Sequence, residues 1–156
     1  MIYFDLDGVI RDLHSCVEPK QKFLEWNSPI KGRNFLEYFD ENLHLLVESR
    51  PTEYYEEIIL WNDSIPIITS QPYGWRENTL IWIEKYLPKA TVIFDSEKLH
   101  LLKEGDYIVE DYPNYNDYSK VILIDRPYNR CVRNPLLRIK KPIELRRFLN
   151  DTFISE

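Results

Sequence analysis

The sequence has few of the features that mark secreted or membrane-spanning proteins. It contains only two cysteines, Cys16 and Cys131, which lie far apart and not in a CxxC arrangement. We therefore expect reduced thiols, with neither a disulfide framework nor a zinc site. No apolar run approaches the length of a membrane span, and no charged stretch followed by an apolar one opens the chain. These absences favour a cytoplasmic protein with no membrane partner.

Positive charge is outweighed by negative charge. Twenty Lys and Arg residues stand against 26 Asp and Glu residues, so the formal net charge is −6 and the pI is about 5.2. A protein that binds nucleic acid regardless of sequence needs a basic face to neutralise phosphates, so we expect no stable nucleic-acid binding. A small anionic substrate is still compatible with this charge, because a bound metal ion can supply positive charge locally.

What the sequence does contain is an alternation of short β-prone runs and helical patterns. With 44% hydrophobic residues in 156, the chain has enough apolar side chains for one packed domain over 1–156. The alternation predicts an α/β fold with a doubly wound, Rossmann-like parallel sheet. The predicted strands are Ile2–Leu6, Ile65–Thr69, Thr91–Phe94, Tyr107–Val109 and Lys120–Ile124. The predicted helices of this core are Trp75–Leu87 and one that begins at Pro142.

One long stretch between the first two predicted strands breaks this alternation. Its residue pattern predicts helices at Lys20–Trp26 and at Thr52–Trp61, the second with Thr52 as N-cap. A further helical face is predicted from six apolar residues, Phe35, Leu36, Phe39, Leu43, Leu46 and Val47. A simple crossover between parallel strands needs only one helix. We therefore expect residues 11–63 to form a small helical cap inserted over the strand ends, with Arg11 and Asp12 at its hinge.

The predicted cap is rich in aromatic residues. Most of them are expected to form a small core that packs the cap on itself. Three of them, Phe23, Trp26 and Phe39, are candidates to line the cleft and stack on a nucleobase, because aromatic stacking tolerates any base.

Polar residues that can carry chemistry follow four of the predicted strands. They are Asp5 and Asp7, Thr69 and Ser70, Lys98, and Glu110 and Asp111. Ligands of open parallel sheets bind at the carboxyl ends of the strands, so these side chains are expected to share one crevice. Neighbouring carboxylates need a cation or a shared proton, and a hydroxyl at a strand-to-helix turn can bind an anion. The combination predicts metal-assisted phosphoryl transfer.

The same residues resemble the motifs of the haloacid dehalogenase (HAD) superfamily of phosphohydrolases. The four similar segments, for motifs I to IV in order, are Asp5-Leu6-Asp7-Gly8-Val9, Ile67-Ile68-Thr69-Ser70, Lys98, and Ile108-Val109-Glu110-Asp111. Within the superfamily, the sequence looks most like the 5'(3')-deoxyribonucleotidase (type C 5'-nucleotidase) family. That closer likeness rests on Asp-x-Asp-Gly-Val, Thr-Ser, Ser-Glu-Lys, the acidic pair with Pro113 after it, and Pro127-Tyr128-Asn129.

The resemblance implies a Mg²⁺-dependent phosphomonoester hydrolase that forms an aspartyl-phosphate. Asp5 would be the nucleophile, and Asp7 the general acid whose backbone carbonyl also binds Mg²⁺. Thr69, Ser70 and Lys98 would hold the phosphoryl oxygens, with Lys98 also offsetting the charge of Asp5. The implied metal ligands are Asp5, Asp7, Asp111 and Glu110. A nucleoside monophosphate is the favoured substrate.

Several points stay open at the level of sequence. The family often has Asp at both positions of the acidic pair, so Glu110 leaves unsettled which residue of the pair touches the metal. Lys103 is a rival for the role of Lys98, and Tyr128 and Asn129 could border the site or only order the C-terminal loop. The three histidines are expected to be structural or exposed: His14, His44 and His100.

Other functions also remain compatible with these residues. The substrate could be another small phosphate or a polynucleotide end. The chain could instead be a phospho-acceptor or a non-catalytic binding module. Homodimerisation is compatible with the sequence and is not specified by it.

Overall fold

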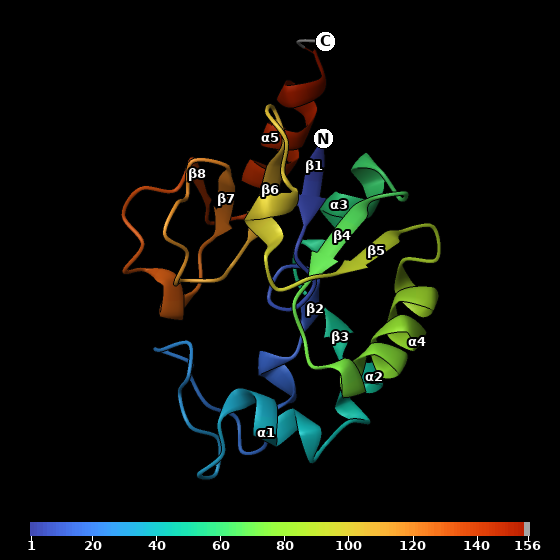
Figure 1. The fold of residues 1–156 in the computed structure, drawn as a ribbon, viewed down its shortest axis with the longest axis vertical. Helices are drawn as coiled ribbons and strands as arrows, with labels where there is room; N and C mark the ends of the chain where they lie inside the picture. Colours follow the sequence, from blue (N-terminus) through green and yellow to red (C-terminus); the bar gives the residue numbers. More distant parts are fainter. Residues whose placement is uncertain (155–156) are drawn as a thin grey trace.

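A six-stranded parallel sheet forms the centre of the molecule. The computed structural model describes residues 1–154, with side chains for residues 1–152, and Figure 1 shows its fold. The sheet order is β5-β4-β1-β6-β7-β8, and every neighbouring pair is parallel. The strands are β1 (Ile2–Phe4), β4 (Pro66–Thr69), β5 (Thr91–Phe94), β6 (Tyr107–Glu110), β7 (Val121–Ile124) and β8 (Leu137–Ile139). The predicted α/β class with a Rossmann-like parallel sheet is confirmed, and so are the five predicted strands.

β8 is a strand that the apolar pattern does not predict. It is three residues long, its central residue is Arg138, and Leu137 is 38% exposed. A strand at the edge of a sheet pairs on one side only, so it needs no continuous apolar run. Its position is set by pairing with β7, where Ile124 lies opposite Ile139.

The strand order reverses between β1 and β6. The chain passes from β1 through β4 to β5 on one side, and then returns to place β6 on the other side of β1. Such a reversal leaves a crevice at the carboxyl ends of the two strands, which is where open α/β sheets bind ligands. Phe4 lies opposite Val109, so the residues that follow them, Asp5 and Glu110, are neighbours at this crevice.

Three α-helices cover one face of the sheet. They are α3 (Tyr55–Trp61), α4 (Arg76–Tyr86) and α5 (Pro142–Ile154). Their side chains Ile58, Trp82 and Leu145 join the aliphatic residues of the strands in a single core. The opposite face is covered by the 3-10 helix η3 (Lys98–Leu101) and by the tyrosine-rich loop after β6. None of the helices in residues 1–154 is long and apolar enough to cross a lipid bilayer.

The helices of the core agree with the sequence in part. α4 and α5 form where they were predicted, but α3 begins at Tyr55, with Tyr54 as its N-cap. Thr52 lies two residues before this N-cap, and its hydroxyl donates to the Val9 carbonyl and accepts from the Tyr54 N–H group. α3 packs against the sheet core through Ile58. It therefore belongs to the helical layer on the sheet, and the expectation that it lies over the strand ends is wrong.

The inserted segment, residues 11–53, contains less regular structure than predicted. Its elements are β2 (Arg11–Asp12) paired antiparallel with β3 (Arg50–Pro51), the 3-10 helix η1 (His14–Cys16), α1 (Phe35–Asp40) and α2 (Leu45–Glu48). In Figure 1 these elements lie beyond the carboxyl end of β1. No helix forms at Lys20–Trp26, so that prediction is wrong. Only Phe23 of that stretch is buried, and a short helix needs a packed apolar face to be stable.

The single helical face predicted over 35–47 is divided between α1 and α2. The Asn42 side chain donates to the Tyr38 carbonyl (2.8 Å), and the Asn42 N–H group bonds to the Phe39 carbonyl. These bonds satisfy the last carbonyls of α1 and end it. The side chains of Leu36 and Leu43, which the single face would have buried, are 49% and 38% exposed.

Hydrogen bonds tie the inserted segment to α4 and to the 3-10 helix η2 (Tyr73–Trp75) before it. Three hydrogen bonds run from Trp75 Nε1 to Asp40 Oδ1 (2.7 Å), from Asn78 Nδ2 to the Leu43 carbonyl (2.8 Å), and from Trp82 Nε1 to the Ser49 carbonyl (2.9 Å). Side chains of η2 and α4 therefore hold one side of the inserted segment against the core.

Candidate active site

Three buried carboxylates meet in the crevice between β1 and β6. Asp5 follows β1, Glu110 ends β6, and Asp111 comes next. Each offers one carboxylate oxygen, and these oxygens lie within 4.8 Å of one another. Asp5 is 7% exposed, whereas Glu110 and Asp111 are fully buried. Within the part of the chain that the structure describes, no other group of three or more acidic, histidine or cysteine side chains is close enough to share a metal ion.

One lysine accompanies the three carboxylates. Lys98 Nζ donates to Asp5 Oδ1 (2.6 Å) and to Glu110 Oε1 (2.7 Å). Burial alone would lower the pKa of Lys98, but the two carboxylates outweigh burial and raise the pKa, so the ammonium group stays charged. Lys103 is exposed, and its N–H group bonds to Asp106. The lysine at the crevice is therefore Lys98.

Glu110 uses both of its carboxylate oxygens within the protein. Oε1 accepts hydrogen bonds from Lys98 Nζ and from the Tyr115 hydroxyl (2.7 Å). Oε2 accepts from the N–H groups of Asp111 (2.9 Å) and Tyr112 (3.1 Å). Burial would raise the pKa of Glu110, but Lys98 and the other donors lower it. Glu110 is an ionised carboxylate whose hydrogen-bonding capacity is filled.

Asp111 is in the opposite situation. Its Oδ2 accepts a hydrogen bond from the Tyr128 hydroxyl, but its Oδ1 is buried and has no hydrogen-bond partner among the described residues. Burial, together with the negative charge of Glu110, raises the pKa of Asp111 to about 7. A buried polar atom without a partner is costly. The unpaired oxygen and the carboxylate donors around it fit a hard divalent cation, which prefers such ligands.

Asp5 is the member of the cluster that retains some exposure. Burial and the negative charge of Glu110 raise the pKa of Asp5 well above its ordinary value, although Lys98 opposes them. Three carboxylates thus face one ammonium group. A second cation would relieve the surplus negative charge, because buried charges are costly unless they are paired.

The Asp7 carboxylate is not part of this cluster. It faces Arg11, whose Nε lies 2.6 Å from Oδ1 and whose second terminal nitrogen lies 3.0 Å from Oδ2. The Asp7 side chain is 16% exposed and lines the same cleft as Asp5. Because the resemblance implies metal binding through the Asp7 backbone carbonyl, the direction of the side chain leaves that role open.

Gly8 allows the chain to pass close to the site. Its φ of +84° lies in the left-handed region that favours glycine. A Cβ atom at this position would overlap the Asp111 carboxylate and crowd the Tyr128 hydroxyl. The close approach of the backbone to Asp111 therefore requires glycine.

The loop after β7 holds these groups in place. It contains the short 3-10 helix η4 (Pro127–Asn129). Arg126 donates to the Gly8 carbonyl from two nitrogens (3.2 and 2.9 Å), and Asn129 Nδ2 donates to the Asp111 carbonyl (2.9 Å). Tyr128 and Asn129 thus support Asp111 directly. In the sequence, the Pro127-Tyr128-Asn129 segment pointed to these two residues. Sequence reasoning missed Arg126, because a single arginine in a loop is most often a surface residue.

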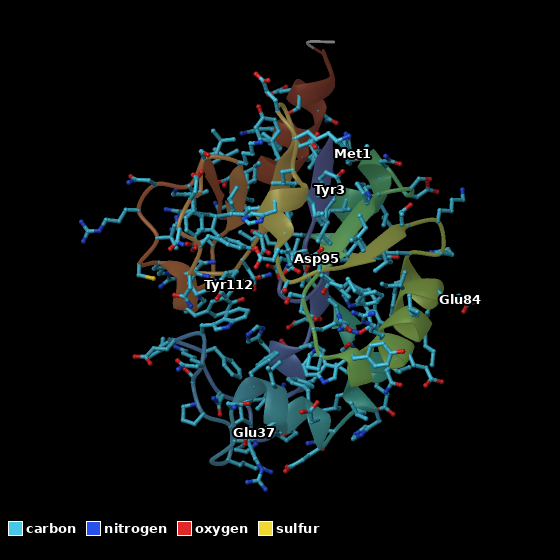
Figure 2. All side chains as sticks on the ribbon, viewed as in Figure 1. Met1, Tyr3, Glu37, Glu84, Asp95 and Tyr112 are labelled. Carbon is cyan, nitrogen blue, oxygen red and sulfur yellow. The ribbon has the colours of Figure 1, made fainter. Side chains whose placement is uncertain are left out.

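A cleft of about 500 Å³ leads to Asp5. The structure brings the predicted catalytic and phosphate-binding residues together in its lining: Asp5, Asp7, Thr69, Ser70 and Lys98. Thr69 is buried and Ser70 is exposed. The remaining lining is largely apolar and includes Trp26, Phe35, Leu36, Tyr112 and Tyr115. Figure 2 shows the labelled Tyr112 between the sheet and the inserted segment.

The site therefore unites an acidic cluster, a charged lysine and two hydroxyl groups at the switch point of the sheet. No model of a known protein family matches this chain, and no curated protein matches it.

Of the three aromatic residues expected to stack on a base, Trp26 alone lines this cleft. Its ring lies 5.3 Å from that of Tyr112, in an edge-to-face arrangement. Phe23 is buried and packs edge-on against His14 (4.7 Å), at a different cavity. Phe39 is fully buried in the core of the inserted segment. The expectations for Phe23 and Phe39 are wrong, because packing within the segment uses both rings.

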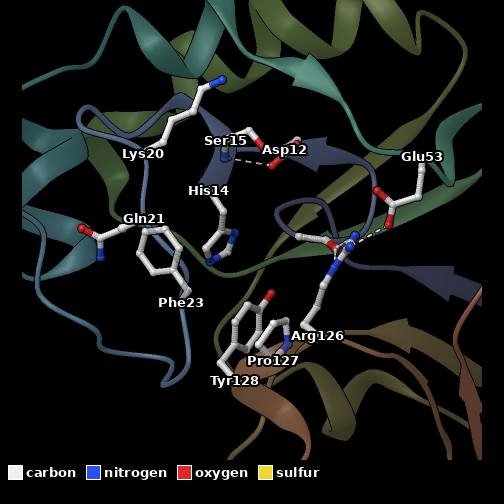
Figure 3. Close-up of a pocket in the computed structure, with 11 residues that line it drawn as sticks. Asp12, His14, Ser15, Lys20, Gln21, Phe23, Glu53, Arg126, Pro127 and Tyr128 are labelled. Atoms are coloured by element: carbon white, nitrogen blue, oxygen red, sulfur yellow. Dashed lines mark hydrogen bonds and ion pairs between the residues drawn. The ribbon is translucent and has the colours of Figure 1, made fainter.

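That different cavity, of about 350 Å³, borders Gly8 and Tyr128, and Figure 3 shows the side chains around it. His14 lies against Tyr128 with the ring centroids 5.1 Å apart and the rings nearly parallel. Burial lowers the pKa of His14 to about 4, so the ring is neutral. Arg126 pairs with Glu53 (2.6 Å) at this cavity. No member of the acidic cluster lines it, within the residues described, so it is separate from the candidate active site.

Proposed function

We propose that this protein is a Mg²⁺-dependent phosphomonoester hydrolase that acts through an aspartyl-phosphate on Asp5. The observation that carries the proposal is the Asp111 carboxylate, whose buried Oδ1 lacks a partner among the described residues and which lies within 4.8 Å of an oxygen of Asp5. Lys98 occupies the same crevice. A candidate cation site and a carboxylate that could act as a nucleophile thus lie together, which supports the proposal because the resemblance to the HAD motifs would require both.

The first step is attack of an Asp5 oxygen on phosphorus, which forms a bond to phosphorus as the bond to the leaving oxygen breaks. Hydrolysis of phosphate monoesters is so slow without a catalyst that the barrier must fall by roughly 20 kcal/mol. A carboxylate nucleophile divides the reaction into two easier displacements. Lys98, held 2.6 Å from Asp5, offsets the negative charges that meet in this step.

Asp5, Asp111 and the backbone carbonyl of Asp7 would hold the metal ion. Bound Mg²⁺ would supply positive charge at the phosphoryl oxygens. Glu110 has no oxygen left to bind the metal ion, because both of its oxygens already accept hydrogen bonds from other groups of the protein. In this proposal Glu110 instead positions Lys98 and the backbone at Asp111.

Asp7 and Thr69 would act on different oxygens of the phosphate group that Asp5 attacks. Asp7 would give a proton to the leaving oxygen, and would later take one from the water that hydrolyses the aspartyl-phosphate. The Thr69 hydroxyl would donate a hydrogen bond to a phosphoryl oxygen. Both residues line the cleft, which supports these assignments.

The cleft favours a phosphomonoester whose remainder is flat and uncharged. Of the described residues that line it, Lys98 is the only cation, and it already bonds to two carboxylates. A second phosphate would therefore find no cation to bind. The rings of Trp26, Phe35 and Tyr112 offer apolar surface on which a base could stack. We favour a nucleoside monophosphate over a bisphosphate or a polynucleotide end.

Phosphate release from a substrate panel tests the proposal. The panel contains nucleoside and deoxynucleoside monophosphates, sugar phosphates and an oligonucleotide with a terminal phosphate, each assayed with Mg²⁺ and with EDTA. We expect hydrolysis of nucleoside monophosphates with Mg²⁺ alone. Turnover that survives EDTA, or no turnover on any substrate, would contradict the proposal. An acyl-phosphate that accumulates on Asp5 without being hydrolysed would indicate a phospho-acceptor.

A further inference from the structure

Arg11 is a buried arginine that the steps above do not use. Its side chain is fully buried, and it grips both carboxylate oxygens of Asp7 (2.6 and 3.0 Å). Its remaining terminal nitrogen donates to the Leu46 carbonyl in α2 (3.0 Å) and to Thr79 Oγ1 in α4 (3.2 Å). One side chain therefore joins the loop after β1, the inserted segment and α4.

The hydrogen bonds continue from Thr79 to the end of β4. The Thr79 hydroxyl donates to Gln71 Oε1 (2.7 Å), and Gln71 Nε2 donates to Thr69 Oγ1 (3.2 Å). Thr79 and Thr69 are buried, and Gln71 is half-buried. A chain of three hydrogen bonds thus connects Arg11 to the hydroxyl proposed to bind the phosphoryl group.

The three bonds of this chain all run in the same direction, beginning with Arg11 as the donor. A guanidinium group has donors and no acceptor, so Thr79 accepts from Arg11 and gives its own hydrogen to Gln71. The Gln71 amide turns its oxygen to Thr79 and its NH₂ group to Thr69. Because Thr69 Oγ1 accepts from Gln71, its hydrogen is free to point elsewhere. A phosphoryl oxygen in the cleft can only accept, which matches this orientation.

We infer that Arg11 is a positioning residue for two groups of the proposed reaction, the Asp7 carboxyl and the Thr69 hydroxyl. Through Asp7 it orients the group that protonates the leaving oxygen. Through Thr79 and Gln71 it orients the Thr69 hydroxyl as a donor to the phosphoryl group. When Asp7 gives up its proton, the adjacent guanidinium stabilises the carboxylate that forms. This inference rests on the proposed function.

The inference has an Asp7 arm, which is the contact of Arg11 with Asp7, and a Thr69 arm, which is the chain of hydrogen bonds from Arg11 to Thr69. Two substrates with different leaving groups test the Asp7 arm. p-Nitrophenyl phosphate releases a stable phenolate, whereas a nucleoside 5'-monophosphate releases an alkoxide that needs a proton. Arg11→Lys keeps the positive charge but cannot form the two-pronged contact. We expect its kcat to fall about tenfold further with the nucleotide than with p-nitrophenyl phosphate, because only the nucleotide depends on the proton donor. Equal losses with both substrates would overturn this arm, since a merely structural defect affects both alike.

Thr79→Val and Gln71→Met test the Thr69 arm and leave the contact between Arg11 and Asp7 in place. Valine has nearly the same shape as threonine but no hydroxyl. Thr79→Val therefore breaks the chain of hydrogen bonds from Arg11 to Thr69, which we call the relay. We expect KM to rise about tenfold with both substrates, and the affinity for inorganic phosphate in the presence of Mg²⁺ to fall by a similar factor. The ratio of kcat between the two substrates should not change. Unaltered phosphate affinity in both variants would overturn this arm.

Asn78→Ala is the matched control for these variants. It removes a neighbouring hydrogen bond between α4 and the Leu43 carbonyl, outside the relay, and should alter neither the kcat ratio nor phosphate affinity. If Arg11→Lys does not fold, as judged by circular dichroism, Thr79→Val and Gln71→Met decide the inference. Phosphate affinity is measured by calorimetry without turnover. A wild-type protein that binds phosphate and hydrolyses neither ester therefore contradicts the proposed function and leaves the relay to be judged on binding.

Discussion

The two walls of the cleft are built differently. The sheet wall places Asp5, Thr69 and Glu110 at the ends of parallel strands whose core is mainly aliphatic. The other wall combines Trp75, Tyr112 and Tyr115 with side chains of the inserted segment. The core of that segment is mainly aromatic, and its α-helices have six and four residues. A hydrogen-bonded sheet holds atoms at the fixed distances that bond-making chemistry needs, whereas packed rings provide surface. Substitutions of the reacting groups in the sheet wall should therefore affect turnover, and those of the packed rings in the inserted segment should affect affinity or stability.

The largest effect is expected from removing the proposed nucleophile in the sheet wall. Asp5→Asn keeps the shape of the side chain, and we expect it to abolish phosphate release in a steady-state assay with Mg²⁺. Asp63→Asn makes the same change at an exposed residue that pairs with Lys89 (3.0 Å). This control should keep the wild-type rate. Full activity of Asp5→Asn would refute the mechanism.

Two substitutions in the inserted segment should separate stability from affinity. Phe39→Ala empties a fully buried site and should lower the free energy of unfolding by about 3–5 kcal/mol in urea denaturation. Trp26→Ala removes a ring that lines the cleft and should raise KM about tenfold with little change in kcat, since stacking contributes about 1–3 kcal/mol per base. A large fall in kcat with Trp26→Ala would show that this wall also takes part in the chemistry.

The two neighbouring carboxylates Glu110 and Asp111 should differ in their effect on metal binding. Asp111→Asn should weaken Mg²⁺ binding by more than about tenfold in a calorimetric titration. Glu110→Gln should have a smaller effect on Mg²⁺ affinity. It should instead lower the free energy of unfolding by about 1–3 kcal/mol, because Lys98 loses a charged partner. Equal losses of affinity would show that Glu110 is also a ligand.

The smallest expected effect is on the stability of the metal-free protein as pH changes. Burial and Glu110 raise the pKa of Asp111 to about 7, from an ordinary value of 3.8. A raised pKa in the folded state contributes stability that is complete below the ordinary pKa and is lost as pH rises through 7. Asp5, whose pKa burial also raises, acts in the same direction.

Without metal, this effect should make the protein less stable at pH 8 than at pH 5.5, by on the order of 1–2 kcal/mol. Mg²⁺ should therefore raise the melting temperature more at pH 8 than at pH 5.5, because it binds the ionised carboxylates. Thermal melts with Mg²⁺ and with EDTA at both pH values measure the difference. The same Mg²⁺ effect at both pH values would contradict the role given to Asp111.

The sheet wall could be predicted from the sequence, because short β-prone runs identify strands and the topology then places their ends together. Asp5, Thr69, Lys98 and Asp111 follow from this reasoning. The inserted segment could not be predicted in the same way, since Lys20–Trp26 has helix-compatible residues and no packed face to stabilise them. Two partners of Arg11, Leu46 and Thr79, lie 35 and 68 residues away along the chain, and no spacing rule connects residues so distant.

A fragment that stopped at Ile124 would still contain every residue to which a step of the reaction is assigned. It would lack Tyr128 and Asn129, which bond to the Asp111 carboxylate and carbonyl, and Arg126, which bonds to the Gly8 carbonyl. The proposed metal ligand and the turn next to Asp7 would both lose their anchors. A minimal catalytic fragment must therefore extend through η4, although that part of the chain contributes no reacting group of its own.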